Sequence, residues 1–93
     1  MKTLNVKVKN VVSSRGNKTP NQFIIETGEG RYFQSYNSVI AFIPFNGKVK
    51  LDSYYWDYSK TTGKYRNIFL GENKAETEKK IKNGIYELVN LNN

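Results

Sequence analysis

One segment, residues 56–71 with the sequence WDYSKTTGKYRNIFLG, limits the possible folds of this chain more than any other. It combines one Trp, two Tyr and one Phe with four Asp, Ser or Thr side chains that can accept hydrogen bonds from the first N–H groups of a helix. The segment ends at Gly71, and glycine readily adopts the left-handed conformation that closes many helices. We therefore predict a helix that is capped by Asp57 or Ser59 and ends at Gly71.

The apolar residues of this segment predict part of a hydrophobic core. Tyr65, Ile68 and Phe69 are three and four residues apart, which places their side chains on one face of a helix. Only 38% of the chain is hydrophobic, but 14% is aromatic, and each buried aromatic side chain removes about 150–250 Å² from water. Because these large side chains offset the low hydrophobic content, we expect Trp56 and Phe69 to be core residues.

Upstream of this helix, five short segments have the pattern of β-strands. In the first of them Leu4, Val6 and Val8 alternate with polar residues, which is typical of a strand with one buried face. Turn residues separate the segments, and Asn46-Gly47 is the strongest hairpin signal among them. We expect an antiparallel meander, with strands at residues 4–12, 22–27, 31–36, 39–45 and 48–51 and a loop at 13–21.

The C-terminal third predicts a second helix and one more strand. Asn73 and Glu76 have the spacing of a capping box, in which each side chain bonds the backbone N–H of the other residue. Asn83-Gly84 would end this helix, and residues 85–90 alternate like a strand. The chain is therefore predicted to be a single domain over residues 1–93 with an α+β fold in the order β-β-β-β-β-α-α-β. This fold is an antiparallel sheet of five to six strands with two short helices packed on one face.

The composition excludes most catalytic mechanisms. The chain has no Cys, which excludes disulfides, thiolate catalysis and cysteine zinc sites. It also has no His, which is the usual general base near neutral pH and the commonest metal ligand. Asp52 and Asp57 flank the aromatic residues, but such carboxylates are more typical of a turn and a helix cap than of a catalytic pair. We therefore expect a protein that is not an enzyme and has neither a cofactor nor a metal site.

The sequence shows no targeting or membrane segment. Residues 1–12 include three lysines and lack the unbroken apolar stretch of a signal peptide. No run of residues approaches the ~18 apolar residues that a membrane helix needs. We therefore expect a soluble, cytoplasmic protein with no membrane partner.

Positive charge is the clearest indication of a binding partner. Fifteen Lys and Arg against eight Asp and Glu give a formal net charge of +7, which favours contact with phosphate or with an acidic protein face, or else serves solubility alone. Tyr side chains between these cations could stack on bases or anchor a protein interface, although some of them could instead be core residues. Only three of the cations are Arg, fewer than is typical of nucleic-acid readers, and the lysines at 79–82 could simply be a solvated helix face. The residues that we expect to bind a macromolecule are Arg31, Tyr54, Tyr58, Lys60, Lys64, Arg66, Lys79, Lys80 and Lys82.

Four stretches of the chain carry a resemblance to one family. They are WDYSKTTGKYRNIFLGE and ETEKKIKNGIYELVNLN, preceded by FQSYNSVIAFI and GKVKLDSYYWDYS. These stretches resemble a family of small uncharacterised proteins from phages and mobile elements of low-GC Gram-positive bacteria. The resemblance covers residues 33–92 approximately, and residues before about 22 lie outside it.

The resemblance implies a cellular context rather than a site. Small accessory phage proteins often bind and inhibit host machinery, including CRISPR effectors, or bind nucleic acid. For this chain it implies a non-enzymatic, anti-CRISPR-like inhibitor in the cytoplasm of a bacterial host cell, as a monomer or small homo-oligomer. Its partner would be a host or defence protein, such as a CRISPR effector ribonucleoprotein. The alternative is a small basic protein that binds DNA or RNA, whereas the basic charge argues against a mimic of DNA, which would be acidic.

Overall fold

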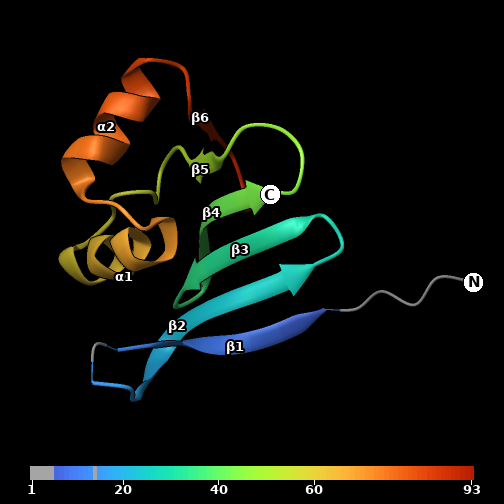
Figure 1. The fold of residues 1–93 in the computed structure, drawn as a ribbon, viewed down its shortest axis with the longest axis vertical. Helices are drawn as coiled ribbons and strands as arrows, with labels where there is room; N and C mark the ends of the chain where they lie inside the picture. The colour runs from blue at the N-terminus through green and yellow to red at the C-terminus, as the bar shows by residue number, and fades with distance from the viewer. Residues whose placement is uncertain (1–5, 14) are drawn as a thin grey trace, which may run out of the picture.

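The computed structural model describes residues 6–13 and 15–93 and contains one mixed sheet and two helices (Figure 1). The elements follow the predicted order, so the α+β prediction is confirmed. Their bounds are β1 (Lys7–Val12), β2 (Lys18–Thr27), β3 (Gly30–Ser35), β4 (Ser38–Pro44), β5 (Lys50–Asp52), α1 (Lys60–Leu70), α2 (Lys74–Lys82) and β6 (Glu87–Val89).

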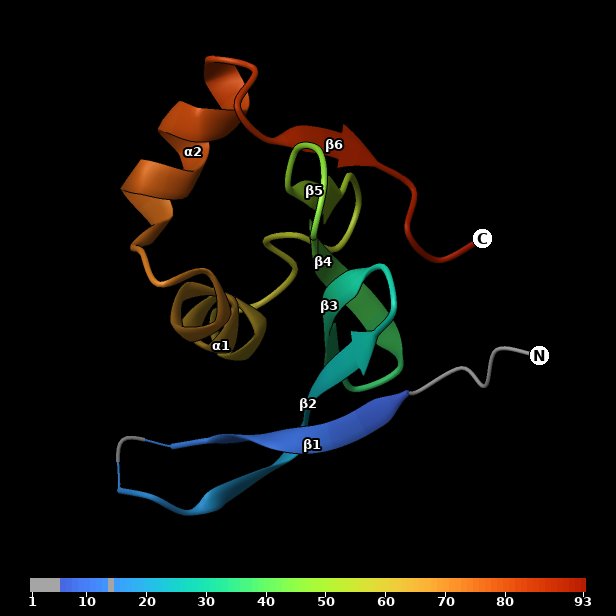
Figure 2. The same cartoon turned by 45° about the vertical axis from the view of Figure 1, so that its right-hand side comes forward.

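The six strands lie in the sheet in the same order as in the sequence. Strands β1 to β5 pair antiparallel with their neighbours, as predicted, and β6 pairs parallel to β5. The parallel pair follows from the connection, because α1 and α2 carry the chain back across the sheet before β6 starts. Figure 2 shows both helices on the same side of the strands.

The β1–β2 hairpin is longer than the sequence indicated. The predicted loop at 13–21 is wrong in its second half, because β2 begins at Lys18, which pairs with Val12 of β1. Pro20 is tolerated inside β2 because β3 pairs with β2 only from Gln22 onward, which leaves one side of β2 without a partner strand at Pro20.

The predicted buried face of β1 is also wrong. Val6 and Val8 are 54% and 62% exposed, and Leu4 lies outside the described residues. Val8 pairs with Ile25. Because neighbouring residues of a strand point to opposite faces, both side chains lie on the sheet face that has no helix against it. The register shifts after Asn10, and Val11 is the residue of β1 that enters the core.

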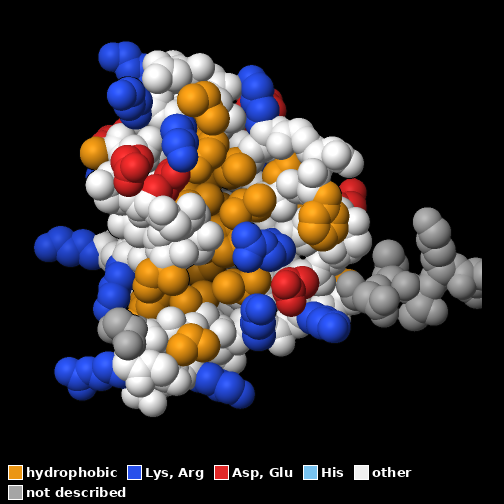
Figure 3. Space-filling view, in the orientation of Figure 1, with side chains coloured by type: hydrophobic (Ala, Val, Ile, Leu, Met, Phe, Trp, Pro, Cys, Tyr) orange, Lys and Arg blue, Asp and Glu red, His pale blue; other side chains and the backbone are white. Residues whose placement is uncertain are grey.

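The core lies between α1 and the middle of the sheet. Phe33 of β3 stacks on Phe69 of α1 with ring centroids 5.7 Å apart, and both rings are buried. In the sheet, Phe33 is flanked by Ala41 and then Leu51, both fully buried. Figure 3 shows hydrophobic side chains reaching the surface as a strip between the helices and the lower strands, so the two helices cover this face only in part.

Two predicted core residues lie nearer the surface. Ile68 is 48% exposed, because the buried side of α1 runs from Thr62 through Tyr65 to Phe69 and leaves Ile68 beside it. Trp56 packs against the core but is only half-buried. The prediction for Ile68 is therefore wrong, the prediction for Trp56 holds in part, and the prediction for Phe69 is confirmed.

Both helices are capped as the sequence predicted. Ser59 accepts a hydrogen bond from the backbone N–H of Thr62 at 3.1 Å, and Gly71 closes α1 with a φ of 71°. Asn73 and Glu76 form a reciprocal capping box at the start of α2, with N···O distances of 2.8 and 3.0 Å. Within the described residues, neither helix is long and apolar enough to cross a membrane.

A buried carboxylate ties the C-terminal residues to the sheet. Asp52, at the end of β5, is 2% exposed. Its Oδ1 accepts hydrogen bonds from Leu91 N and Asn92 Nδ2, and its Oδ2 accepts them from Tyr54 N and Tyr55 N, at 2.8–3.1 Å. Burial alone raises the pKa of Asp52, but these four hydrogen bonds favour the charged form and hold the pKa below its ordinary value.

Candidate functional site

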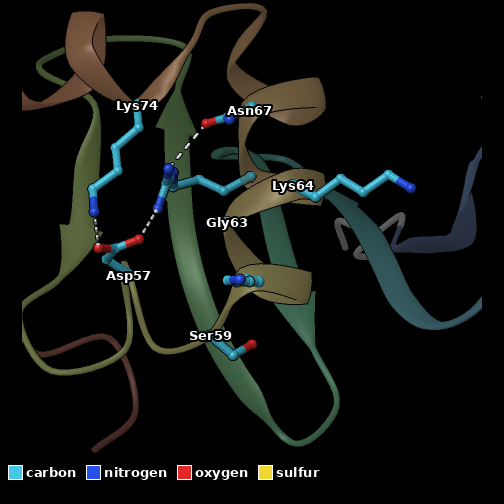
Figure 4. Close-up of a pocket in the computed structure, with 8 residues that line it drawn as sticks. Asp57, Ser59, Gly63, Lys64, Asn67 and Lys74 are labelled. Atoms are coloured by element: carbon cyan, nitrogen blue, oxygen red, sulfur yellow. Dashed lines mark hydrogen bonds and ion pairs between the residues drawn. The ribbon is translucent and has the colours of Figure 1, made fainter.

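A pocket with a volume of about 560 Å³ opens beside the N-terminal half of α1 (Figure 4). It is lined by residues of α1, of the loop before α1 and of α2, which the capped ends of the helices bring together. We call it the basic pocket; its residues are Asp57, Ser59, Lys60, Gly63, Lys64, Arg66, Asn67 and Lys74. Four of these side chains are cationic at neutral pH and one is a carboxylate, so an excess of positive charge lines the pocket.

Asp57 holds two of the four cations in place. Its Oδ1 lies 3.1 Å from Arg66 Nη1, and its Oδ2 lies 2.7 Å from Lys74 Nζ. Partial burial raises the pKa of Asp57, but the hydrogen bonds and charges of Lys74 and Arg66 outweigh burial and lower it overall. The hydrogen bond with Asp57 also raises the pKa of Lys74, so the carboxylate of Asp57 and the ammonium of Lys74 both stay charged at neutral pH.

Arg66 is a structural member of the pocket rather than an exposed cation. Its side chain is 1% exposed, and its guanidinium donates hydrogen bonds to the Trp56 carbonyl at 2.7 Å and to Asn67 Oδ1 at 2.9 Å. The guanidinium also lies 5.1 Å from the centroid of the Trp56 ring. These contacts engage both terminal nitrogens of the buried guanidinium, whereas its Nε has no hydrogen-bond partner, and they fix the loop before α1 against the helix.

Lys60 and Lys64 are the cations of the pocket that remain available to a ligand. They lie one helical turn apart on α1, about 6 Å along its axis. Among the described residues, no acidic side chain forms an ion pair with either lysine. Figure 4 shows Lys64 extending away from the Asp57–Lys74 pair, so the two parts of the pocket present separate positive charges.

A second, smaller pocket of about 280 Å³ adjoins the first at Ser59, which lines both. Its walls come from the β3–β4 turn and from the segment before α1. We call it the tyrosine pocket; its residues are Ser35, Tyr36, Asn37, Ser38, Ile40, Tyr55, Tyr58, Ser59 and Thr62. Hydroxyl groups and aromatic rings together dominate this lining.

Three tyrosines cluster at the edge of the tyrosine pocket. The ring centroids of Tyr54 and Tyr55 are 4.7 Å apart with an edge-to-face angle of 86°, and those of Tyr55 and Tyr58 are 5.3 Å apart. Tyr54 is 72% exposed and Tyr58 63% exposed. The cluster therefore presents rigid aromatic surface to solvent beside the basic pocket.

A family model described as a family of unknown function, DUF8033, matches residues 6–84, which is most of the chain. The chain belongs to this family. The predicted membership of an uncharacterised family is thereby confirmed. The match begins at residue 6, so the prediction that residues before about 22 lie outside the family is wrong for DUF8033. No curated protein and no solved structure matches the chain.

The DUF8033 match spans both pockets and all nine residues that the sequence predicted to bind a macromolecule, and five of these residues lie in or beside the pockets. Lys60, Lys64 and Arg66 come together in the basic pocket. Tyr54 and Tyr58 lie beside it in the tyrosine cluster. Arg66 is the exception among them, because its buried guanidinium is used by Asp57, Asn67 and the Trp56 carbonyl and is not an exposed contact.

The other four predicted binding residues of this DUF8033 chain line neither pocket. The guanidinium of Arg31 lies 5.6 Å from the centroid of the Phe69 ring. Lys80 Nζ lies 2.6 Å from a carboxylate oxygen of Glu72, a side chain that is only 4% exposed. Lys79 and Lys82 are exposed in the last turn of α2, where cations interact favourably with the helix dipole.

The residues predicted to bind a macromolecule did not include Lys74 or Tyr36. Lys74 is the first residue of α2, where a cation opposes the helix dipole, and this unfavourable placement could have indicated a nearby carboxylate. The carboxylate is Asp57, which lies in another segment of the chain. Tyr36 follows β3 in a tight turn. It is one of the tyrosines that the sequence suggested could stack on bases, but its position did not single it out as a binding residue.

The two carboxylates that flank the aromatic residues do not converge. Asp57 lines the basic pocket and is engaged by two cations, whereas Asp52 lines neither pocket. Across residues 6–13 and 15–93, no group of three or more acidic side chains could hold a metal ion. The two pockets offer positive charge, hydroxyl groups and aromatic rings to a ligand.

Stability should fall in acid because three carboxylates titrate abnormally in the folded state. Asp52, Asp57 and Glu72 have pKa values below their ordinary 3.8 and 4.5, since hydrogen bonds and cations outweigh burial. The unfolded chain therefore binds more protons at low pH, and the stability from these groups is lost as the pH falls below about 5. Urea midpoints should be level near neutrality and then decline. A midpoint that does not change down to about pH 3 would contradict this account.

Proposed function

We propose that this protein is a non-enzymatic binding module that binds nucleic acid at the basic pocket, with phosphate groups at Lys60 and Lys64. The observation that carries the proposal is the excess of positive charge in one pocket, where Lys60 and Lys64 are exposed and no described carboxylate pairs with them. Because Asp57 is shared by Arg66 and Lys74, it does not neutralise Lys60 or Lys64. Polyanions are attracted to such a surface, and they release counterions when lysines neutralise their phosphates.

The tyrosine cluster favours nucleic acid over an acidic protein face. Exposed aromatic rings beside a positively charged groove are the arrangement by which proteins bind strands with little sequence preference, because every base can stack. Tyr58 is exposed, and it precedes Ser59, the residue that lines both pockets. Tyrosines also anchor protein interfaces, so a competition experiment is needed to separate a nucleic acid from an acidic protein partner.

We expect the affinity for an oligonucleotide to depend steeply on salt. If two or three phosphates bind the pocket lysines, affinity should fall about tenfold between about 50 and 200 mM salt, since each phosphate contributes roughly −0.7 to −0.9 to the slope of log K against log salt. Fluorescence anisotropy with a labelled single strand and its duplex measures this slope. No binding of either probe at low salt would reject the proposed function.

A polyanion without bases separates this proposal from nonspecific attraction. Polyglutamate carries a high density of negative charge but offers no phosphate and no base. We expect it to compete weakly with the oligonucleotide at equal charge concentration. Competition as strong as that of unlabelled oligonucleotide would instead favour the acidic protein partner that the net charge also permits.

The anti-defence role implied by the family resemblance stays a prediction. A phage-encoded inhibitor of a CRISPR effector ribonucleoprotein would act in the bacterial cytoplasm and would meet guide RNA there, so the same surface serves both hypotheses. We propose this role as the biological setting of the binding activity. Binding to an effector that is lost when its RNA is removed would support it, whereas equal binding to the RNA-free effector would favour a protein contact.

A further inference from the structure

The tyrosine pocket is placed and sized to bind part of a nucleic acid. Its volume of about 280 Å³ lies just below the roughly 300–1,000 Å³ of pockets that bind drug-sized molecules, so it suits one planar base better than a larger group. It shares Ser59 with the basic pocket. A strand with a phosphate near Lys60 can therefore place an adjoining base in the tyrosine pocket.

Tyr36 occupies a backbone position that disfavours it. It is the first of the two residues that turn β3 into β4, and its φ is 55°, in the left-handed region that glycine adopts without steric cost. Hydrogen bonds fix this conformation, from Tyr36 N to the Asn21 carbonyl at 2.7 Å and from Gln34 Nε2 to the Tyr36 carbonyl at 2.9 Å. The turn thus holds an aromatic ring, 52% exposed, at the pocket in spite of the strain.

The segment before α1 supplies a second aromatic ring to the tyrosine pocket. Tyr58 lines the pocket from the segment before α1 and packs on Tyr55, which also lines it. Tyr54 lies on the outside of this pair, with its centroid 6.3 Å from that of Tyr58. Contacts on both neighbours limit the freedom of the Tyr58 ring, which lowers the entropy cost of stacking it on a base.

Hydroxyl groups give the pocket hydrogen-bonding capacity. Ser35 Oγ and Thr62 Oγ1 are buried and hydrogen-bonded to each other at 3.0 Å, and Thr62 Oγ1 also accepts a hydrogen bond from Ser59 Oγ, so each hydroxyl keeps only part of its capacity for a ligand. Ser38 and Asn37 line the pocket nearer the surface. A hydroxyl or amide can both donate and accept, so these groups can match the edges of different bases and would impose little sequence preference.

From these features we infer that the tyrosine pocket binds an unpaired base of a single-stranded nucleic acid whose phosphate lies in the basic pocket. The inference rests on the proposed function, and it adds the strand type and the position of the base. A base in a duplex is stacked and paired, so it cannot enter the pocket without being extruded. Single strands should therefore bind more tightly than duplexes of the same length.

Two strands of equal charge test the inference. One is an oligothymidylate of about ten nucleotides, within the range of known single-strand sites, and the other is an abasic strand with the same phosphates. We expect the intact protein to bind the oligothymidylate about tenfold more tightly, which is the affinity that one stacked base provides. Tyr58→Ala and Tyr36→Gly should each remove most of this preference and leave the affinity for the abasic strand unchanged.

Two controls separate base binding from folding. Tyr36→Gly places glycine at the positive φ, so its melting temperature should not fall even though its base preference is lost. Phe45→Ala removes another exposed ring, in the β4–β5 loop, and should change neither strand's affinity. Equal affinity of the intact protein for both strands would overturn the inference and leave the proposed function standing. Binding to neither strand would overturn both.

Discussion

Replacing Lys60 and Lys64 together by glutamine should weaken the binding of a single-stranded oligonucleotide on the order of fiftyfold at about 50 mM salt. Both lysines line the basic pocket, and no described acidic side chain pairs with them. For single strands each neutralised phosphate contributes about 0.7 to the salt dependence, so the magnitude of the slope of log K against log salt should decrease by about 1.4. Anisotropy titrations at several salt concentrations measure both quantities.

The lysines at the end of α2 provide a matched control. Lys79→Gln with Lys82→Gln removes the same two charges from an exposed helical turn that lines neither pocket. We expect this pair to weaken binding no more than about threefold, because only long-range attraction is lost. Equal losses in the two double variants would show that the phosphates do not bind at the basic pocket. All four lysines are solvent-exposed or nearly so, and the melting temperature should change little in either variant.

The ends of the helices could be predicted from the sequence because the bonds that define them are local. Ser59 bonds Thr62, and Asn73 bonds Glu76, each over a separation of three residues. Gly71 closes α1 through its own backbone conformation. Residue type and spacing are sufficient in such cases, since no other part of the chain takes part in the interaction.

The sheet face on which each β1 side chain lies, and the burial of Arg66, could not be predicted in this way. Val8 alternates with lysines, but the pairing register determines which face it lies on, and an alternating pattern does not contain the register. Arg66 is a charged residue of the kind that usually lies on the exposed side of a helix. It is buried because the Trp56 carbonyl and Asp57, about ten residues earlier, fold back onto α1 and bond its guanidinium.

The candidate site could be predicted only in part, because local spacing indicates some of its residues and contacts between distant segments bring in the others. Lys60 and Lys64 share a helix face, which spacing alone indicates. The pocket itself needs Lys74 from α2 and Asp57 from the preceding loop, and the tyrosine pocket needs the β3–β4 turn against the segment before α1. Contacts between distant segments create both pockets, and a single sequence does not contain them.

Replacing Asp52 by asparagine should lower the free energy of unfolding by about 3 kcal/mol. Each carboxylate oxygen of Asp52 accepts two hydrogen bonds, from Leu91 and Asn92 on one side and from Tyr54 and Tyr55 on the other. In either orientation of an asparagine amide, the NH₂ group would face two N–H donors that are left without an acceptor in a buried position. For a domain of this size the loss corresponds to a melting temperature lower by roughly 15 °C, which thermal unfolding followed by circular dichroism measures.

Glu87→Gln on the neighbouring strand β6 is the control for the Asp52 variant, since it also removes one negative charge. Glu87 pairs with Lys50 at 3.5 Å, and its side chain is 46% exposed, so we expect a change of less than about 0.5 kcal/mol. A similar small change for Asp52→Asn would contradict the anchoring role of Asp52. Leu91 and Asn92 follow residue 84, where the DUF8033 match ends. A large loss of unfolding free energy in the Asp52 variant alone would therefore indicate that the residues beyond the family match help to hold β5 and β6 in the sheet. This part of the sheet lies beneath the helices that form the basic pocket.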